Sequence, residues 1–344
     1  MSKVLIIRLS AIGDVAMTIP VIYSVAEANP DDSFTVFTQT FLMPLFVNRP
    51  PNVNVMGINI KNTEKSLFGF LRYAFILRKY EFDIVLDLHS VIRSRLVDII
   101  FCLSGKKVFM IDKGRKERRN LTGRPPKKIS RLRPATGRYA DVFRAAGFRF
   151  EETFVSLYDN NPVNDRAIQA IAGNKDGYWI GIAPFAKHKG KVYPIEKMEK
   201  VVKTLSERDD VTVFLFGGRG EEEVILNGWE NKYARTRSVV GRYTLDMELP
   251  LISKLDLFVC MDSANMHFAS LVGVKIISIW GATHPYAGFL GYHQREDLAV
   301  QVDLPCRPCS IYGNKPCFRG DWACMNEITS ERIIDKIDSY LEQL

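Results

Sequence analysis

The sequence predicts an α/β protein of two doubly wound domains, each a parallel sheet covered by helices. The chain has 344 residues, too many for one ordinary core and suited to two domains of about 150 residues. Short, nearly all-apolar runs alternate with helical stretches from end to end, as in parallel sheets buried on both faces. The alternation occurs twice, and a polar, turn-forming stretch at 158–162 separates the two series.

The first series predicts an N-terminal domain over residues 1–155. Its expected strands are Val4–Arg8, Ser33–Thr38, Ile84–Asp87 and Lys107–Met110. Its expected helices are Val15–Ala28, Thr63–Lys79, Val91–Leu103 and Arg138–Ala146. In two-domain proteins of this kind the ligand binds in an interdomain cleft, outside the carboxyl ends of the strands. Residues that directly follow a strand are therefore the first candidates for a site.

The second series predicts a C-terminal domain over residues 156–344. Its expected strands are Trp179–Ile182, Val211–Phe216, Leu257–Met261 and Lys275–Trp280. Its expected helices are Ile195–Ser206, Gly220–Gly228, Ala264–Val272 and Ser330–Leu344. We expect the last of these helices, at about 330–344, to pack across the domain junction.

The composition is that of a soluble globular protein, with 47% hydrophobic and 25% charged residues. No apolar run approaches the length of about 18 residues that a transmembrane helix requires. The first residues, Met1 to Arg8, resemble a first strand and not a signal peptide. We therefore expect a cytoplasmic protein.

The positive charge is concentrated in one segment, residues 113–138. This segment holds eleven Lys and Arg residues against the single acid Glu117, a formal +10 where the whole chain carries +8. Such a concentration suggests a polyanionic partner, although a solvated loop is the simpler alternative. It contains no Phe or Tyr before Tyr139 at its edge, so we do not expect nucleic acid to be the partner.

The turn after the first strand reads Arg8-Leu9-Ser10-Ala11-Ile12-Gly13-Asp14-Val15. Small residues allow a tight strand-to-helix turn, and Asp14 begins the helix, where the helix dipole favours a carboxylate. A helix cap explains Asp14 equally well. The turn lacks the Gly-x-Gly-x-x-Gly spacing of a dinucleotide site, which argues against a dehydrogenase.

Three segments of the second domain are candidates for holding phosphate and ribose. Asp262-Ser263-Ala264-Asn265-Met266-His267 follows a strand and opens a helix whose free N–H groups suit a diphosphate. Lys191 belongs to a lysine-rich loop after another strand, and Glu221 follows the glycine turn Gly217-Gly218. Each also has a plain structural explanation: a cap, a solvated loop, or a glutamate in a first helical turn.

Together these motifs resemble glycosyltransferase family 9 along nearly the whole chain. The family's Arg-x-Ser-x-x-Gly-Asp-Val segment matches Arg8 to Val15, and its Lys-x-Trp-Pro segment matches Lys191 to Pro194 with Tyr193 for Trp. Its Gly-Gly-x-x-Glu segment matches Gly217 to Glu221. Its Asp-Ser/Thr-Gly-x-x-His-x-Ala segment matches Asp262 to Ala269, with Ala264 for Gly.

The resemblance implies a GT-B fold and inverting transfer of a heptose from an ADP-sugar to a lipopolysaccharide inner-core acceptor. It implies Asp14 as the catalytic base and Lys191 as the cation at the leaving diphosphate. Glu221 or Glu222 would bind ribose. The rest of the donor site would be Asp262, Ser263, Ala264, Met266 and His267. For the acceptor, an anionic lipid A core glycolipid, we expect Ser10, Gly13, Arg118, Arg119, Lys127 and Lys128.

A soluble enzyme with such an acceptor is expected to be peripheral at the cytoplasmic face of the inner membrane. No cofactor is expected, because no Asp-x-Asp sequence is present to bridge a diphosphate through a divalent metal. Four cysteines near the C-terminus, Cys306, Cys309, Cys317 and Cys324, lack the spacing of a common zinc ribbon. Structural zinc, disulfides and unligated packed thiols all remain open for them, with packed thiols favoured.

Two other functions are compatible with parts of the sequence. A nucleotide-sugar epimerase of GT-B fold would convert its donor without an acceptor and would not need the basic segment. A nucleic-acid-binding protein would use residues 113–138 but would leave the donor-site motifs unexplained. A transferase of the same type with a different donor sugar is also possible, because no residue decides between sugars.

Overall fold

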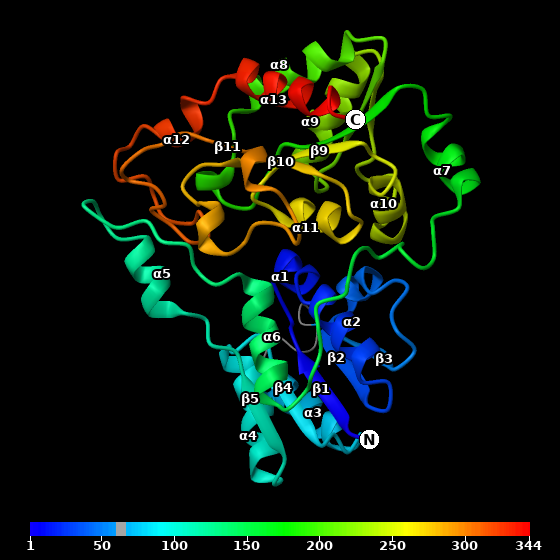
Figure 1. Cartoon of the computed structure of the whole chain (residues 1–344), viewed down its shortest axis with the longest axis vertical. Coiled ribbons are helices and arrows are strands. Elements are labelled where there is room, and N and C mark those ends of the chain that lie inside the picture. The colour runs from blue at the N-terminus through cyan, green and yellow to red at the C-terminus, as the bar shows by residue number, and fades with distance from the viewer. Residues whose placement is uncertain (60–66) are drawn as a thin grey trace. The chain divides into compact units, whose positions relative to one another are not determined.

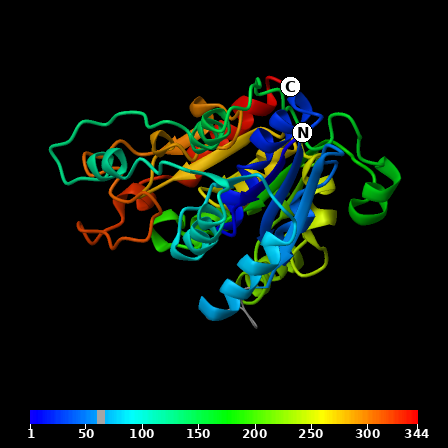
Figure 2. The same ribbon diagram turned by 90° about the horizontal axis from the view of Figure 1, so that it is seen from below.

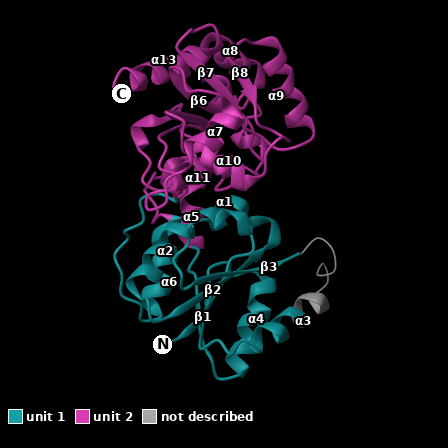
Figure 3. Ribbon diagram, turned by 90° about the vertical axis from the view of Figure 1, so that its right-hand side faces the viewer, with its two compact units in different colours: residues 1–113, 135–157 teal, residues 114–134, 158–344 magenta. Residues whose placement is uncertain are grey.

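The computed structural model describes residues 1–59 and 67–344, which form two compact units (Figures 1 and 3). The first unit comprises Met1–Lys113 and Ala135–Leu157, and the second comprises Gly114–Pro134 and Tyr158–Leu344. The chain passes from one unit to the other after Leu157, two residues beyond the expected boundary. Residues 114–134 differ from expectation: their place in the sequence suggests the first domain, but they pack with the second unit.

The first unit contains a five-stranded parallel sheet with the order β3-β2-β1-β4-β5, seen from a second side in Figure 2. Its strands are β1 (Lys3–Ile7), β2 (Ser33–Gln39), β3 (Val53–Ile58), β4 (Ile84–Asp87) and β5 (Lys107–Met110). The four expected strands are confirmed. The edge strand β3 escaped prediction because asparagine and glycine interrupt its apolar residues.

Helices cover both faces of this sheet, with α2 and α6 on one side and α3 and α4 on the other (Figure 3). The helices are α1 (Ile12–Ala16), α2 (Ile19–Ala28), α3 (Leu67–Arg78), α4 (Ile92–Leu103) and α6 (Ala135–Ala145), with a 3₁₀ turn η1 (Thr40–Leu45). The start expected for α3, at Thr63, lies outside the described residues. The single helix expected over Val15–Ala28 is wrong: it is broken at Met17 and Thr18. Pro20 has no N–H for a continuous ladder, and Thr18 Oγ1 instead donates to the Val15 carbonyl at 2.7 Å.

The second unit contains a six-stranded parallel sheet with the order β11-β10-β9-β6-β7-β8. Its strands are β6 (Tyr178–Ala183), β7 (Val211–Leu215), β8 (Thr236–Ser238), β9 (Leu257–Met261), β10 (Ile276–Trp280) and β11 (Ala299–Gln301). The four expected strands occupy the centre. The edge strands β8 and β11 are three residues long and too short to leave a pattern in the sequence.

The α-helices of the second unit are α5 (Arg115–Leu121), α7 (Asp165–Ala172), α8 (Ile195–Ser206), α9 (Glu221–Lys232), α10 (Leu245–Ile252), α11 (Ala264–Leu271), α12 (Ala323–Asn326) and α13 (Ser330–Leu341). Three 3₁₀ turns accompany them, η2 (Lys189–Lys191), η3 (Pro285–Ala287) and η4 (Glu296–Leu298). The C-terminal helix α13 packs on α8 and buries Ile333, Ile337 and Leu341 in the core of its own unit. Within the described residues, no helix combines the length and apolar character needed to cross a membrane.

Candidate active site

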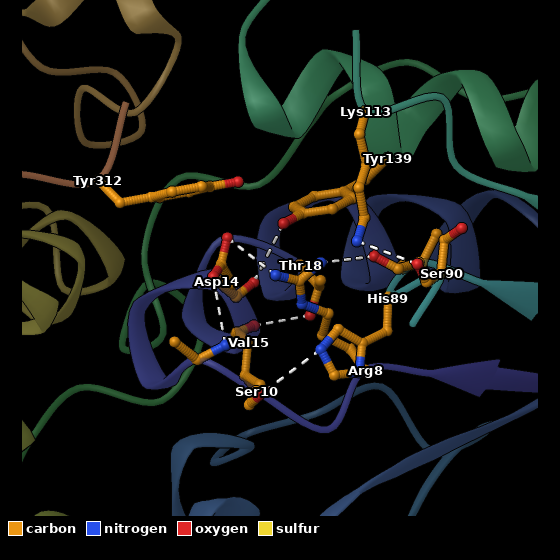
Figure 4. A network of polar contacts seen from close by, with 12 residues as sticks. Arg8, Ser10, Asp14, Val15, Thr18, His89, Ser90, Lys113, Tyr139 and Tyr312 are labelled. Atoms are coloured by element: carbon orange, nitrogen blue, oxygen red, sulfur yellow. Dashed lines mark hydrogen bonds and ion pairs between the residues drawn. The ribbon is translucent and has the colours of Figure 1, made fainter. Parts of the chain in front are cut away.

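Asp14 lies at the carboxyl end of the first sheet, in the first helical turn after β1 (Figure 4). Strand β1 is buried from Val4 to Ile7, and the Arg8 N–H still bonds the Phe37 carbonyl of β2 at 3.1 Å. The chain then turns, and the Ala11 N–H donates to Asp14 Oδ2 at 3.2 Å while the Ala11 carbonyl accepts from Val15 N at 3.0 Å. The turn thus fixes Asp14 where the alternation of strand and helix predicted a polar site.

Arg8 forms an ion pair with Asp14. Its Nη2 lies 2.9 Å from Asp14 Oδ1, and its Nη1 donates to the Leu88 carbonyl after β4 at 2.6 Å. Arg8 is only 7% exposed, whereas the Asp14 side chain keeps 22% of its surface accessible. The carboxylate is therefore held from the protein side and remains open to solvent on the other.

A second turn, after β4, adds a histidine that the sequence analysis missed. Asp87, fully buried, accepts hydrogen bonds at Oδ1 from the His89 and Ser90 N–H groups and at Oδ2 from the Ser94 hydroxyl. This fixes the His89 ring so that Nε2 lies 3.2 Å from Ser10 Oγ. Burial, and then the charges of Arg8 and Lys113, lower the pKa of His89 to about 3, so the ring is neutral at physiological pH.

The signal for His89 was present in the sequence. Leu88-His89-Ser90 follows the expected strand Ile84–Asp87, and β4 pairs directly with β1. The residues that follow two neighbouring parallel strands lie close together at the carboxyl end of the sheet. Lys113 and Tyr139 lie at the same end of the sheet (Figure 4). Lys113 Nζ donates to the Ser90 carbonyl at 3.1 Å, and the Tyr139 hydroxyl lies 3.5 Å from the Asp14 carbonyl.

In the second unit, Lys191 and Asp262 come together from two separate loops. Lys191 ends η2, Asp262 follows β9, and Lys191 Nζ lies 2.8 Å from Asp262 Oδ2. The two side chains are 15% and 4% exposed. A buried carboxylate thus fixes the amine of Lys191 beside the start of α11.

Helix α11 begins at Ala264, with Ser263 at its N-cap position. The Ser263 side chain makes no capping hydrogen bond, and its buried hydroxyl has no partner among the described residues. Met266 is fully buried, so it supports the site through packing, and His267 is 6% exposed. The free N–H groups and the Ser263 hydroxyl give this helix terminus the donors that an anion requires.

The glycine turn after β7 is held by Glu222. Its Oε2 accepts from the Gly218 N–H at 2.6 Å, and a Cβ added at Gly217 would lie 2.8 Å from Leu226 Cδ1. Glu221 is exposed at the start of α9 and is free of this contact with the turn. Tyr193, which stands where the family motif has Trp, is fully buried and donates to the Ile328 carbonyl at 3.1 Å.

Part of the basic segment is bound to its own unit. Arg118 donates to the Tyr312 hydroxyl at 2.8 Å, and Lys127 donates to the Cys306 and Pro308 carbonyls. Arg131 makes a two-armed ion pair with Glu296. Six acceptor residues were expected, and four of them lie in this segment. Of these four, Arg119 and Lys128 are exposed to solvent, whereas Arg118 and Lys127 are partly buried.

The four C-terminal cysteines line one small cavity together with Arg307. All are free thiols, and no group of three or more potential ligands among the described residues is arranged to hold a metal ion. Burial raises the pKa of Cys324 to about 11 and also raises that of Cys309, so both thiols are protonated at neutral pH. Arg307 is buried beside them and donates to the Gly281, Trp280 and Thr283 carbonyls.

Comparison with known proteins gives a consistent picture. Residues 71–316 match the family model described as glycosyltransferase family 9 (heptosyltransferase). Lipooligosaccharide heptosyltransferase 2 from Campylobacter jejuni is 22% identical over 336 residues, 96% of both chains.

Two solved structures share the fold. A family 9 glycosyl transferase from Veillonella parvula superposes with a TM-score of 0.76 at 18% identity, covering 100% of this chain and 98% of that one. The ADP-heptose lipopolysaccharide heptosyltransferase II of E. coli gives a TM-score of 0.72 at 19% identity, over 99% of both chains. The expected α/β fold with parallel sheets is thereby confirmed as that of the GT-B heptosyltransferases.

Proposed function

The chain belongs to glycosyltransferase family 9, and from this premise we propose that it transfers a heptose from ADP-heptose to a lipopolysaccharide inner-core acceptor, with inversion at the anomeric carbon. The observation that carries the proposal is the Asp14 carboxylate, held by Arg8 and Ala11 at the end of β1 and still open to solvent. The names of the relatives support heptose as the sugar and lipopolysaccharide or lipooligosaccharide as the acceptor.

Asp14 is proposed as the general base. It would take the proton of the acceptor hydroxyl while that oxygen attacks the anomeric carbon, and a single displacement inverts the configuration. The partly exposed carboxylate suits this role, because an acceptor must reach it. Ser10 and Gly13, in the same turn, are proposed acceptor contacts.

The second unit is proposed to hold the donor. As ADP leaves, negative charge grows on the β-phosphate, and cations and N–H groups aimed at that charge lower the barrier. Lys191 and the first turn of α11, from Ser263 to His267, supply both kinds of group. Asp262 is proposed to orient Lys191. The ribose is assigned to Glu221, because the Glu222 carboxylate is already bound to the Gly218 N–H.

The exposed basic residues of 114–134 are proposed to meet the anionic glycolipid and the membrane surface that carries it. Arg119 and Lys128 are solvent-exposed, and a lysine or arginine near an anionic surface contributes about 1 kcal/mol of attraction. Lys127 and Arg118 instead tether the segment to the second unit. This supports peripheral association at the cytoplasmic face of the inner membrane.

The test is a pair of substitutions assayed with ADP-heptose and a lipid A core acceptor. Asp14→Asn should lower the rate of transfer by about 10²- to 10⁴-fold, the range for loss of a general base. ADP binding should persist, because the proposed donor residues lie in the other unit. Asp83→Asn is the matched control, since Asp83 precedes β4 at the opposite end of the same sheet. Near-normal turnover by Asp14→Asn would rule out the proposed mechanism.

The same assay separates the alternative functions. A nucleotide-sugar epimerase would change the donor in the absence of acceptor, and ADP release that depends on acceptor argues against it. A transferase for another sugar would bind other nucleotide sugars. Titration with ADP, UDP and GDP, and with their available sugar conjugates, should show selective binding of the ADP forms.

A further inference from the structure

Arg8 connects the proposed base to the framework of the first sheet. It follows β1 directly, and its guanidinium reaches one group 80 residues away in the sequence and one in the turn that begins α1 (Figure 4). One arm, Nη1, donates to the Leu88 carbonyl at the end of β4, at 2.6 Å. The other arm, Nη2, lies 2.9 Å from Asp14 Oδ1. The position of the carboxylate is thus tied to the ends of two neighbouring central strands.

The second oxygen of the carboxylate is fixed independently of Arg8. Asp14 Oδ2 accepts from the Ala11 N–H at 3.2 Å, in the turn that begins α1. One donor alone would leave the carboxylate free to rotate about its Cβ–Cγ bond. Two donors, one on each oxygen, fix the plane of the group and therefore the direction of its remaining lone pairs.

The burial of Arg8 makes this arrangement stiff. The residue is 7% exposed, and its guanidinium carbon lies 5.7 Å from the centre of the Tyr139 ring. A planar guanidinium carries several donors in a fixed fork, so one arginine serves the Leu88 carbonyl and Asp14 together. A lysine is a single point charge on a flexible stem and reproduces the charge without the fork.

We infer that Arg8 is a positioning residue for the transfer reaction, one that acts through Asp14 by fixing the orientation of its carboxylate. The inference rests on the proposed role of Asp14 as the base. It predicts that Arg8 affects the chemical step far more than it affects binding of the donor nucleotide. A displacement of about 1 Å in a reacting group is enough to lower a rate by about 100-fold.

The experiment is a double-mutant cycle on kcat, with ADP-heptose and a lipid A core acceptor as substrates. The variants are Arg8→Met, Asp14→Asn and their combination, with Arg8→Lys as the conservative substitution. Arg8→Met should lower kcat by about 100-fold with the donor KM within about 3-fold of wild type, and Arg8→Lys should recover part of the loss. In the Asp14→Asn background, Arg8→Met should lower the residual rate by less than about 3-fold, because residues that act as a unit are not additive.

The control is Arg49→Met, which also removes an arginine that bonds backbone carbonyls, those of Val53 and Phe46. It should leave kcat near wild type. The inference is overturned if Arg8→Met keeps kcat within about 3-fold, or if its loss multiplies fully with that of Asp14→Asn. Should Arg8→Met fail to fold, as judged by circular dichroism, the cycle with Arg8→Lys decides by the same criteria. If Asp14→Asn itself retains normal turnover, the proposed function fails, and this outcome is distinct from failure of the Arg8 inference alone.

Discussion

Replacing Asp98 with asparagine should make the first unit less sensitive to pH. Asp98 lies in α4 and is 4% exposed, close to the fully buried Asp87 that holds the His89 turn. Burial, and then the negative charge of Asp87, raise the pKa of Asp98 from 3.8 to about 8. The folded chain therefore keeps a proton on Asp98 at neutral pH, whereas the unfolded chain releases it above about pH 4.

Proton linkage gives the sign and the size of the effect. Because the folded state binds the extra proton, the free energy of unfolding falls as the pH rises from about 4 to about 8. The fall is at most ~1.4 kcal/mol per pH unit, so this group removes about 2–3 kcal/mol between pH 5 and pH 7. An asparagine amide has the same shape and no charge, and the variant lacks this fall.

The assay must report on the first unit alone. All four tryptophans lie in the second unit, so their fluorescence follows that unit and serves as an internal reference. Hydrogen exchange of the β4 and α4 amides, measured at increasing urea concentration, follows the first unit. The stability of Asp98→Asn relative to wild type should rise by about 2–3 kcal/mol from pH 5 to pH 7.

Asp83→Asn is the control for this series. The Asp83 carboxylate is half-exposed and accepts from the Lys3 N–H, which lowers its pKa, so it stays ionised in both states between pH 5 and pH 7. Its substitution should shift stability equally at both pH values. The reasoning about Asp98 is wrong if the gap between Asp98→Asn and wild type is the same at pH 5 and pH 7.

Three further predictions concern the donor loop, the basic segment and the cysteines. Lys191→Ala should weaken ADP binding by at least about 10-fold in calorimetric titration, as expected for a lost charge-assisted contact, and unchanged affinity would remove Lys191 from the donor site. Replacing four exposed basic residues with glutamine should weaken binding to anionic vesicles at low salt; the four are Arg115, Arg119, Arg124 and Lys128. Unchanged binding would exclude this segment as the membrane contact. Exposed Cys102 should be alkylated well before Cys324, whose thiol pKa is raised to about 11. Metal analysis of the purified protein should find no stoichiometric metal. Equal alkylation rates or bound zinc would contradict the prediction that the four C-terminal cysteines are packed, unligated thiols.

The sequence alone determined which segments form the interior of each sheet. All eight expected strands are present. Seven of them are central strands, and a central parallel strand is buried on both faces and therefore mostly apolar in sequence. The eighth, β5, is an edge strand of the first sheet. The strands that escaped prediction, β3, β8 and β11, all lie at sheet edges. An edge strand is short or mixed in character, so it leaves little pattern to detect.

The sequence also determined which turns carry the candidate chemistry. Asp14, Lys191 and Asp262 each follow an expected strand. Their motifs also resemble those of one family, and the family assignment is confirmed. Their position at the carboxyl ends of parallel strands is a rule of doubly wound sheets, and such a rule needs no coordinates.

Only the tertiary structure decided which of these groups meet. The bond from Arg8 to Leu88, the contact of Ser10 with His89 and the ion pair of Lys191 with Asp262 join residues about 70 to 80 positions apart. The same is true of residues 114–134, whose basic charge is visible in the sequence but whose attachment to the second unit is not. The apolar pattern of a segment reflects the burial of its own residues, so it can be detected from the local sequence. Contacts between distant residues depend on strand order and loop path, which are properties of the whole fold.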